Sequence, residues 1–336
     1  MQSFSLASLA FCFLLFVSTN ANGQSAEMQA ANKRLGRGIN LGNALEAPNE
    51  GEWGVKLKPE YFTAIKEAGF QTVRLPVKWS AHAKAEAPYT IDAKFFARVD
   101  WAIEQALANK LNIIVNVHHY GEMDSQPDAH LARLVGLWEQ IASHYREQPA
   151  GVYFEILNEP HEKLIEAKWN QAIPPLLAAI RKTNPTRPVI VGPAFWNAIW
   201  ALDKLELPAD KNLILTVHYY DPHQFTHQGA PWAAGADKWK GKKWTGSETE
   251  QAEIQKAFAK AADWAKRHEL PVLLGEFGAY QEADLESRVR WTKFIVHEAE
   301  KQGFSWSYWE FCSGFGAYDP AKDVWRLELK QALLAP

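Results

Sequence analysis

The chain has 336 residues, of which 47% are hydrophobic and 22% are charged, a composition that supports one large core and is unlike that of a disordered chain. Its 36 Lys and Arg are nearly balanced by 39 Asp and Glu, giving a formal net charge of −3. This balance lacks the basic excess of proteins that bind nucleic acid or acidic membranes, so we exclude nucleic acid and membrane as partners.

The first segment, residues 1–23, contains no Asp, Glu, Lys or Arg, and its apolar run is too short to span a bilayer comfortably. Small residues at Ala21 and Gly23 offer a cleavage site before residue 24. We interpret 1–23 as a secretory signal peptide, although it lacks the usual Lys or Arg near its start. The mature chain, residues 24–336, is then expected to be secreted or periplasmic and free of the membrane.

Cysteine is sparse: Cys12 falls in the predicted signal peptide, which leaves Cys312 alone in the mature chain. A single cysteine cannot form an internal disulfide, so export does not imply a disulfide scaffold here. We expect Cys312 to be a packed thiol rather than a nucleophile.

Short runs of β-branched and aromatic residues recur along the mature chain and alternate with longer amphipathic stretches. These runs are continuously apolar, which is typical of strands buried on both faces. We predict eight strands, over 38–41, 72–76, 112–118, 152–157, 188–191, 213–218, 271–275 and 304–309.

The stretches between the strands have helical periodicity, and we predict helices over 93–110, 129–147, 162–184, 250–269, 285–302 and 321–334. Ser247 with Glu250 three residues later forms a capping box, and Gly69 and Gly303 are placed to end helices. Eight strands with helical crossovers predict an α/β fold, a (β/α)8 TIM barrel that forms a single domain over 24–336.

Two features refine this interpretation. A doubly wound sheet would need a Gly-rich phosphate loop after an early strand, whereas Gly36-Arg37-Gly38 comes before the first strand. The connection over 221–249 is too long for an ordinary loop and contains three tryptophans, which indicates a functional segment.

Polar and aromatic residues cluster at the ends of the predicted strands, where a TIM barrel keeps its active site. The residues at these ends are Asn40, Asn43, Arg74, His118, His119, Asn158, Glu159, Trp196, His218, Tyr220, Glu276, Trp309 and Glu310. Glu159 and Glu276 follow the fourth and seventh strands, from which two carboxylates can face each other across the barrel mouth. Such a pair can cleave a glycosidic bond, with one proton donor and one ionised group at the anomeric carbon. An ordinary acid at a helix N-terminus is the alternative for either Glu alone.

Several of these motifs resemble those of glycoside hydrolase family 5, clan A. The strongest are Asn158-Glu159-Pro160 after the fourth strand and Gly275-Glu276-Phe277-Gly278 after the seventh. The likeness extends over nearly the whole mature chain and includes 37–43, 73–76, 117–119, 218–220 and Trp309. It implies a retaining endo-β-1,4-glucanase, a cellulase acting on polysaccharide, with Glu159 as acid/base and Glu276 as nucleophile. We expect a monomer that needs no cofactor and no metal.

The residues around this pair suit the implied chemistry. Arg74 can lie beside Glu276, where a cation lowers the pKa of the carboxyl group, and Tyr220 can donate a hydrogen bond to the same carboxylate. Asn158 can bind the sugar 2-hydroxyl, an interaction that strengthens toward the transition state. A retaining mechanism predicts carboxyl groups about 5–5.5 Å apart. Glu155 shares strand parity with Glu159, and we expect it to form an ion pair inside the barrel.

Histidines add further candidates. His118 and His218 match the two site histidines of the family, with a hydrogen-bonded core histidine as the alternative. A site role and a structural role are both open for His119. Many family members have an Asp two residues before the first of these histidines, whereas this chain has Asn116, which we interpret as structural.

Aromatic residues are abundant, with 15 Trp, 17 Phe and 10 Tyr, and most must fill the core. The flat faces and polar edges of some tryptophans also suit sugar rings. Trp309 matches the family's stacking platform at the cleavage point. Trp79, Trp196 and Trp232 follow other strand ends and are candidates for further sugar subsites, with core filling as the alternative. Asn40 at the end of the first strand is assigned to substrate binding.

Other functions remain open at this point. A metal-dependent hydrolase could use His118, His119 and His218 as ligands, but such sites need three or four converging groups, and no HExxH helix is present. A non-catalytic sugar-binding barrel would normally have lost a catalytic carboxylate, whereas this chain has both Glu159 and Glu276. Among the enzymes, mixed-linked β-glucanase, xyloglucanase and β-mannanase are alternatives to endo-β-1,4-glucanase, because one sequence does not show pocket shape.

Overall fold

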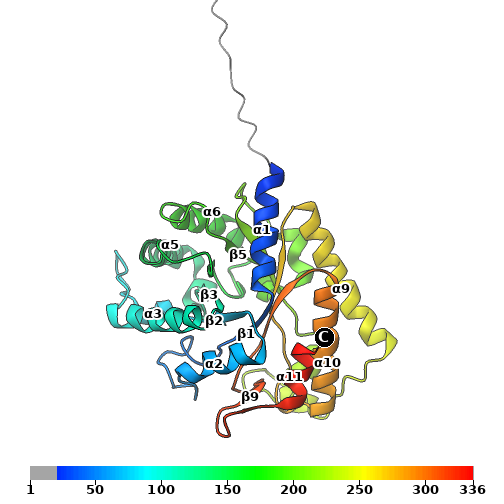
Figure 1. Cartoon of the computed structure of the whole chain (residues 1–336). Coiled ribbons are helices and arrows are strands. Elements are labelled where there is room, and N and C mark those ends of the chain that lie inside the picture. Colours follow the sequence, from blue (N-terminus) through cyan, green and yellow to red (C-terminus); the bar gives the residue numbers. More distant parts are fainter. Residues whose placement is uncertain (1–20, 336) are drawn as a thin grey trace, which may run out of the picture.

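The computed structural model of the chain describes residues 21–335. In this part of the chain, eight parallel strands close a barrel in chain order, with helices around it (Figure 1). The strands are β1 (Arg37–Asn40), β2 (Thr72–Leu75), β3 (Asn112–Asn116), β4 (Val152–Glu155), β5 (Val189–Val191), β6 (Leu213–His218), β7 (Val272–Glu276) and β8 (Ser305–Tyr308). β1 closes the barrel on β8, with Gly38 opposite Ser307. The prediction of a TIM barrel is confirmed.

Long helices cover the outside of the barrel, and short helices lie within its loops (Figure 1). The α-helices are α1 (Ala21–Leu35), α2 (Pro59–Ala68), α3 (Ala93–Ala108), α4 (Gly121–Ser125), α5 (Pro127–His144), α6 (Ala167–Arg181), α7 (Ala194–Asn197), α8 (His223–Thr226), α9 (Glu248–Arg267), α10 (Leu285–Lys301) and α11 (Leu327–Leu334). The 3₁₀ helices within residues 21–335 are η1 (Trp79–His82), η2 (Ile199–Lys204) and η3 (Ala236–Trp239). Within the described residues, no helix combines the length and apolar character needed to cross a bilayer.

Local signals in the sequence set several element ends. The predicted capping box begins α9, because the Ser247 side chain accepts from the Glu250 amide while Glu250 accepts from the Ser247 amide. Gly69 ends α2 at φ 109°, a left-handed conformation that costs glycine little.

Two helices begin later than predicted. α6 starts at Ala167 instead of residue 162, because the backbone of Glu166 has φ 45° and cannot belong to a right-handed helix. α11 starts at Leu327 instead of residue 321, because the chain first folds back as a short antiparallel hairpin. This hairpin pairs β9 (Tyr318–Asp319) with β10 (Val324–Trp325).

Helix α1 covers the end of the barrel where the strands begin (Figure 1, blue). Its residues Met28, Ala31 and Leu35 pack against a small apolar cluster formed by Ile114, Tyr153, Ile190, Ile214 and Leu273. The Asn32 amide also donates to the carbonyl of Val272, the first residue of β7. This end of the barrel is closed, so a ligand must enter from the opposite end. Most of the predicted signal peptide lies outside the described residues, and α1 begins at Ala21, so the boundary after residue 23 stays a prediction.

The inside of the barrel changes from apolar to polar toward the carboxyl ends of the strands. Glu155 lies two residues beyond Tyr153 on β4, and alternate residues of a strand share a face. Arg74 on β2 and Asn40 on β1 occupy the same polar layer, and all three polar side chains are fully buried. A buried polar layer is stable only if its members bond to one another, and here it forms the base of the candidate site.

Candidate active site

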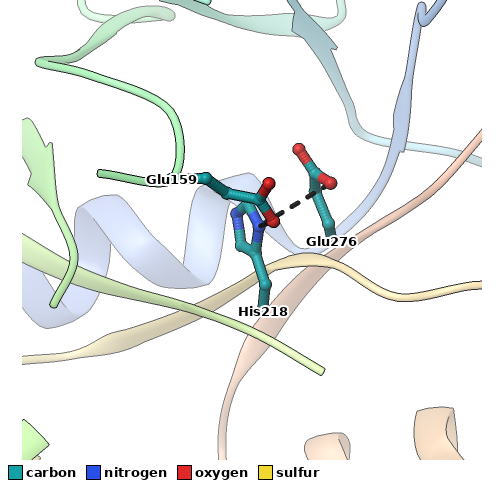
Figure 2. A group of neighbouring side chains, drawn as sticks. All are labelled: Glu159, His218 and Glu276. Atoms are coloured by element: carbon teal, nitrogen blue, oxygen red, sulfur yellow. Dashed lines mark hydrogen bonds and ion pairs between the residues drawn. The ribbon is translucent and has the colours of Figure 1, made fainter. Parts of the chain in front are cut away.

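The carboxyl ends of the strands open into a cleft of about 1560 Å³ that Glu159 and Glu276 both line. A carboxylate oxygen of Glu159 and one of Glu276 lie within 4.8 Å of each other. The His218 ring lies close to both carboxyl groups (Figure 2). This spacing suits a retaining glycosidase, in which a nucleophile and an acid/base stand about 5–5.5 Å apart.

Glu276, the last residue of β7, is held by two donors. Arg74 Nη1 donates to its Oε1 at 2.7 Å, and the Tyr220 hydroxyl donates to its Oε2 at 3.0 Å. Both hydrogen bonds favour the ionised carboxylate and fix its orientation. The predicted neighbours of Glu276 are therefore the observed ones.

Arg74 is the centre of a buried hydrogen-bond network. It makes a bidentate ion pair with Glu155 at 2.7 Å, which is the ion pair expected inside the barrel. It also donates to Asn40 Oδ1 at 2.8 Å and to Asn158 Oδ1 at 2.7 Å. All five guanidinium N–H donors are thus used, so the group cannot rotate away from Glu276.

Glu159 lies four residues beyond the end of β4 and is held by His218. His218 Nδ1 lies 2.7 Å from Glu159 Oε1, and its Nε2 lies 3.3 Å from the amide nitrogen of Asn197. In this arrangement Nε2 accepts and Nδ1–H donates to Glu159. Gly275 makes room for the imidazole, because a Cβ at this position would come within 2.9 Å of His218 Nε2.

Burial controls the protonation of these groups. It raises the pKa of Glu159 to about 7, so this carboxyl group keeps its proton in weakly acidic solution. Burial lowers the pKa of His218 to about 4, so the imidazole is neutral. Burial also raises the pKa of Glu276 above its usual value, although the charge of Arg74 opposes this effect. Arg74 by itself lowers the pKa of Glu276, as expected. Burial has the larger effect, so the expectation that this pKa is lowered overall is wrong.

Several positions with a strained backbone lie around the cleft. Glu159 has φ 46°, His119 has φ 52° and Trp196 has φ 59°, in the left-handed region that non-glycine residues rarely adopt. All three line the cleft. Strain of this kind persists only where the surrounding structure enforces it, and it is common at functional sites.

A metal centre is not supported by the donor set. Within residues 21–335, Glu159, His218 and Glu276 are the group whose potential ligand atoms lie close enough to share an ion. Arg74 stands 2.7 Å from Glu276, and this fixed cation disfavours a second one. His118 and His119 do not belong to the group, so the three histidines proposed as ligands do not converge.

The two neighbouring histidines line the cleft beside Trp309. The His118 ring stacks on Trp309 with centroids 5.8 Å apart, and its Nδ1 lies 3.0 Å from the Asn116 amide. Asn116 also accepts from the backbone amide of Val77, so its structural role is confirmed. The His119 ring contacts the edge of the Trp53 ring at 5.5 Å.

Three of the predicted platform residues, Trp309, Trp196 and Trp232, line the cleft. Trp196 and Trp232 are 54% and 61% exposed, so each ring has free surface for a ligand. Trp232 belongs to the long connection over 221–249 and packs against Tyr280 and Phe315 from the loops after β7 and β8. The long connection therefore forms one wall of the cleft.

Two predicted substrate contacts are wrong. Trp79 is fully buried, and its Nε1 donates to the carbonyl of Asn116 at 3.0 Å, so it is a core residue. Asn40 is also fully buried and does not line the cleft, because its amide nitrogen bonds to the carbonyls of Gly275, Ser307 and Tyr308. Its remaining oxygen accepts from Arg74, so Asn40 positions that side chain instead of touching substrate.

Sequence reasoning missed several residues of the cleft, among them Trp53, Trp200 and Glu46. Trp53 and Trp200 line it and are 40% and 57% exposed. Glu46 also lines it but is buried, where it accepts from the backbone amides of Asn43 and Ala44, and burial raises its pKa to about 8. None of the three follows a strand end directly. Only the unusual number of tryptophans pointed toward the first two.

Comparisons with known proteins agree with this geometry. The sequence model of the cellulase family (glycosyl hydrolase family 5) matches residues 21–314. Endoglucanase H of Acetivibrio thermocellus is 37% identical over 278 residues, which cover 83% of this chain and 30% of that protein. The chain therefore spans less than a third of this relative's length.

Solved structures give a similar result. Cel5A of Thermotoga maritima in complex with cellobiose is 50% identical and has a TM-score of 0.90, covering 91% of this chain and all of that one. The same enzyme in complex with mannotriose is 49% identical, with the same TM-score and coverage. Together with the paired carboxylates, these matches establish that the chain belongs to the cellulase family, glycosyl hydrolase family 5.

Proposed function

We propose that the chain is a secreted, retaining endo-β-1,4-glucanase that hydrolyses internal bonds of cellulose or related β-glucans by double displacement. The observation that carries this proposal is the pair of unlike carboxyl groups with oxygens within 4.8 Å of each other. Glu276 is bound by a cation and a phenol, and Glu159 by a neutral imidazole. Arg74 thus favours the ionised form of Glu276, while burial raises the pKa of Glu159 to about 7, and these are the states that the two roles require.

In the first step, a Glu276 oxygen attacks the anomeric carbon while Glu159 donates its proton to the glycosidic oxygen. The bond from carbon to that oxygen breaks, and a covalent glycosyl-enzyme forms. Asn158 lines the cleft and is held through Oδ1 by Arg74, which leaves Nδ2 to donate to the sugar 2-hydroxyl. This bond strengthens as positive charge develops on the ring.

In the second step, Glu159 is ionised and takes a proton from a water molecule, which attacks the same carbon and releases Glu276. Each displacement inverts the configuration at the anomeric carbon, so the product retains the β configuration. Arg74 and Tyr220 stabilise the Glu276 carboxylate as it leaves.

The extent of the cleft supports cleavage of internal bonds. It is lined by Trp53 from the loop after β1 and by Trp200 from the loop after β5, on different sides of the barrel mouth. A chain of several sugars can therefore lie on both sides of the catalytic pair. The names of endoglucanase H and Cel5A support β-1,4-glucan as substrate, and residues 1–23, which lack charged side chains, support export.

β-Mannan is the second candidate substrate, because the Thermotoga maritima enzyme was solved with mannotriose. Glucose and mannose differ at the 2-hydroxyl, so the contacts around Asn158 decide between them. Mixed-linked β-glucan and xyloglucan belong in the same comparison, since they differ in linkage and branching.

We expect the purified chain to release reducing ends from soluble β-1,4-glucan, and more slowly from β-mannan, mixed-linked β-glucan and xyloglucan. The measurement is a reducing-sugar assay on the four polysaccharides, with Glu276→Ala as the inactive control. A preference for mannan or xyloglucan would keep the mechanism and change the substrate. Binding without turnover on all four would overturn the proposal in favour of a sugar-binding barrel.

The pH profile should report Glu159. Because its pKa is about 7, kcat/KM on β-glucan is expected to fall as the pH rises above that value and the acid loses its proton. Glu159→Gln should lose about 10²–10⁴-fold on polysaccharide but much less on an aryl cellobioside whose leaving group needs no proton. On the aryl cellobioside, kcat/KM of the variant should no longer fall at high pH, so the alkaline limb of the profile should be absent. An unchanged alkaline limb in Glu159→Gln would assign it to another group.

A further inference from the structure

Trp200 is one of the exposed tryptophans that line the cleft. It lies on η2, where its neighbours Ile199, Ala201 and Leu202 are buried, while Trp200 itself is 57% exposed. An exposed indole contributes little to the core, so its contacts must be explained in another way.

The contacts of Trp200 fix the position of its ring without covering it. The Phe195 ring lies 4.8 Å from it at an angle of 44°, and the ammonium group of Lys204 lies 5.9 Å from its centre. Lys260 of α9 donates to the Trp200 carbonyl at 3.2 Å and forms an ion pair with Asp203 at 2.7 Å. The indole is therefore held in place before any ligand arrives, which reduces the entropy lost on binding.

The place of Trp200 relative to the catalytic acid follows from Trp196. The His161 ring, two residues after Glu159, stacks on Trp196 with centroids 5.0 Å apart. The Trp196 amide also donates to the Pro160 carbonyl at 3.2 Å. Trp196 therefore adjoins the loop that carries the acid, whereas Trp200 contacts Phe195 and α9. Along this wall, Trp200 lies beyond Trp196 as seen from Glu159.

This order defines which sugars the wall can contact. Glu159 protonates the bridging oxygen, so the sugars that leave with that oxygen lie on its side of the cleft. Trp309, with His118 stacked on it, lies with Glu276 on the side of the sugar that becomes covalently bound. Trp196 thus faces the first leaving sugar, and Trp200 faces a sugar further along the leaving chain.

We propose that Trp200 forms an outer binding subsite for the leaving portion of a β-linked glycan, together with Glu253 and Lys256 of the adjoining helix α9. These two charged side chains line the cleft on the helix whose Lys260 bonds to the Trp200 carbonyl, and they can hydrogen-bond to the hydroxyl edge of a sugar stacked on the indole. The inference rests on the proposed glycosidase function. It adds that this subsite makes cleavage depend on the length of the leaving fragment.

The test compares Trp200→Ala with the unaltered chain on cellohexaose and on an aryl β-cellobioside. The aryl group cannot reach beyond the first leaving position, so the ratio of the two kcat/KM values isolates the outer subsite. Loss of the indole should lower this ratio about tenfold, which corresponds to about 1.4 kcal/mol. Trp200→Phe should keep more of the ratio than Trp200→Leu, because a flat face rather than apolar bulk is needed.

A second readout is the bond that is cleaved in cellopentaose labelled with ¹⁸O at its reducing end. Without the outer subsite, Trp200→Ala should cleave nearer the reducing end, because long leaving fragments lose their contact. Trp53 contacts His119, next to His118 and Trp309 on the side of the covalently bound sugar, so Trp53→Ala should shift the cleavage in the opposite direction. Leu327→Ala removes a side chain that is 60% exposed outside the cleft, and should keep both the ratio and the pattern.

An unchanged ratio and cleavage pattern in Trp200→Ala would overturn the subsite while leaving the enzyme assignment intact. Failure of the unaltered chain to hydrolyse either substrate would instead overturn the proposed function on which the inference rests.

Discussion

Replacing Glu276 with Ala is expected to lower kcat/KM on soluble β-1,4-glucan by about 10⁴-fold or more, the order of loss that follows removal of a catalytic nucleophile. The variant keeps the Glu159 proton donor and the cleft, but no group remains to form the covalent intermediate. The fold should be retained, because Arg74 keeps its bidentate ion pair with Glu155.

Adding azide tests whether Glu276→Ala loses activity because it lacks the nucleophile. In Glu276→Ala, azide can enter the space left by the carboxylate and attack the anomeric carbon of an activated aryl β-cellobioside, with the new C–N bond forming as the C–O bond breaks. This single displacement inverts the configuration and gives α-cellobiosyl azide. The product is identified by NMR of the anomeric proton.

Glu159→Ala is the matched control, since it removes the other carboxyl group of the pair. Here the glycosyl-enzyme still forms from the activated substrate, and azide attacks it from the opposite face in place of water. Two inversions give β-cellobiosyl azide. The same azide anomer from both variants, or near-normal hydrolysis by Glu276→Ala, would contradict the assignment of the two roles.

The fold and the placement of two carboxyl groups at the barrel mouth were predictable because both follow from local patterns. Strands buried on both faces are continuous apolar runs, and the parallel barrel places their carboxyl ends together. A polar residue at the end of such a strand therefore points to the site, as Glu276 does at the end of β7. Parity along β4 similarly placed Glu155 inside the barrel, where it pairs with Arg74.

The tryptophans show where such reasoning fails. Trp79 and Trp196 both follow a strand end, yet the first is fully buried and the second is 54% exposed. The difference depends on the path of each loop: Trp79 turns inward to donate to the Asn116 carbonyl, whereas Trp196 is anchored outside by Pro160. Trp53 and Trp200 lie in loops whose course no periodicity reveals. The exposure of a side chain depends on the tertiary structure, so it could not be predicted from local sequence patterns.

The network around Arg74 was also only partly predictable. The sequence indicated a cation beside Glu276, but not that the site is buried deeply enough for desolvation to outweigh its charge. Nor did it show that Asn40 binds Arg74 rather than sugar. The number of partners on one guanidinium follows from the convergence of β1, β2, β4 and β7, which only the closed barrel brings about.

Arg74→Met is therefore expected to lower both stability and activity. Methionine nearly fills the volume, but the fully buried carboxylate of Glu155 loses its partner, which costs about 3–5 kcal/mol in the free energy of unfolding. Activity should fall by about 10²–10³-fold, the loss expected when one preorganised electrostatic contact to the reacting group is removed. Urea unfolding and kcat/KM on β-glucan measure the two effects.

The pH profile separates the electrostatic role of Arg74 from its structural one. Loss of the cation disfavours the carboxylate form of Glu276, so the pKa of this group rises further. The reaction needs Glu276 ionised, and the acid limb of kcat/KM should therefore move to higher pH in Arg74→Met. An acid limb that does not move would show that Arg74 acts on stability alone.

The double variant Arg74→Met/Glu155→Gln separates the effect of Arg74 on stability from its effect on activity. Replacing Glu155 removes the unpaired buried charge, so most of the lost stability should return. Activity should stay low and the acid limb displaced, because Glu276 still lacks its cation. If activity returned together with stability, the loss in Arg74→Met would reflect distortion of the barrel. If stability returned alone, Arg74 would tune the nucleophile directly, and its ion pair with Glu155 would be the device that holds it in place.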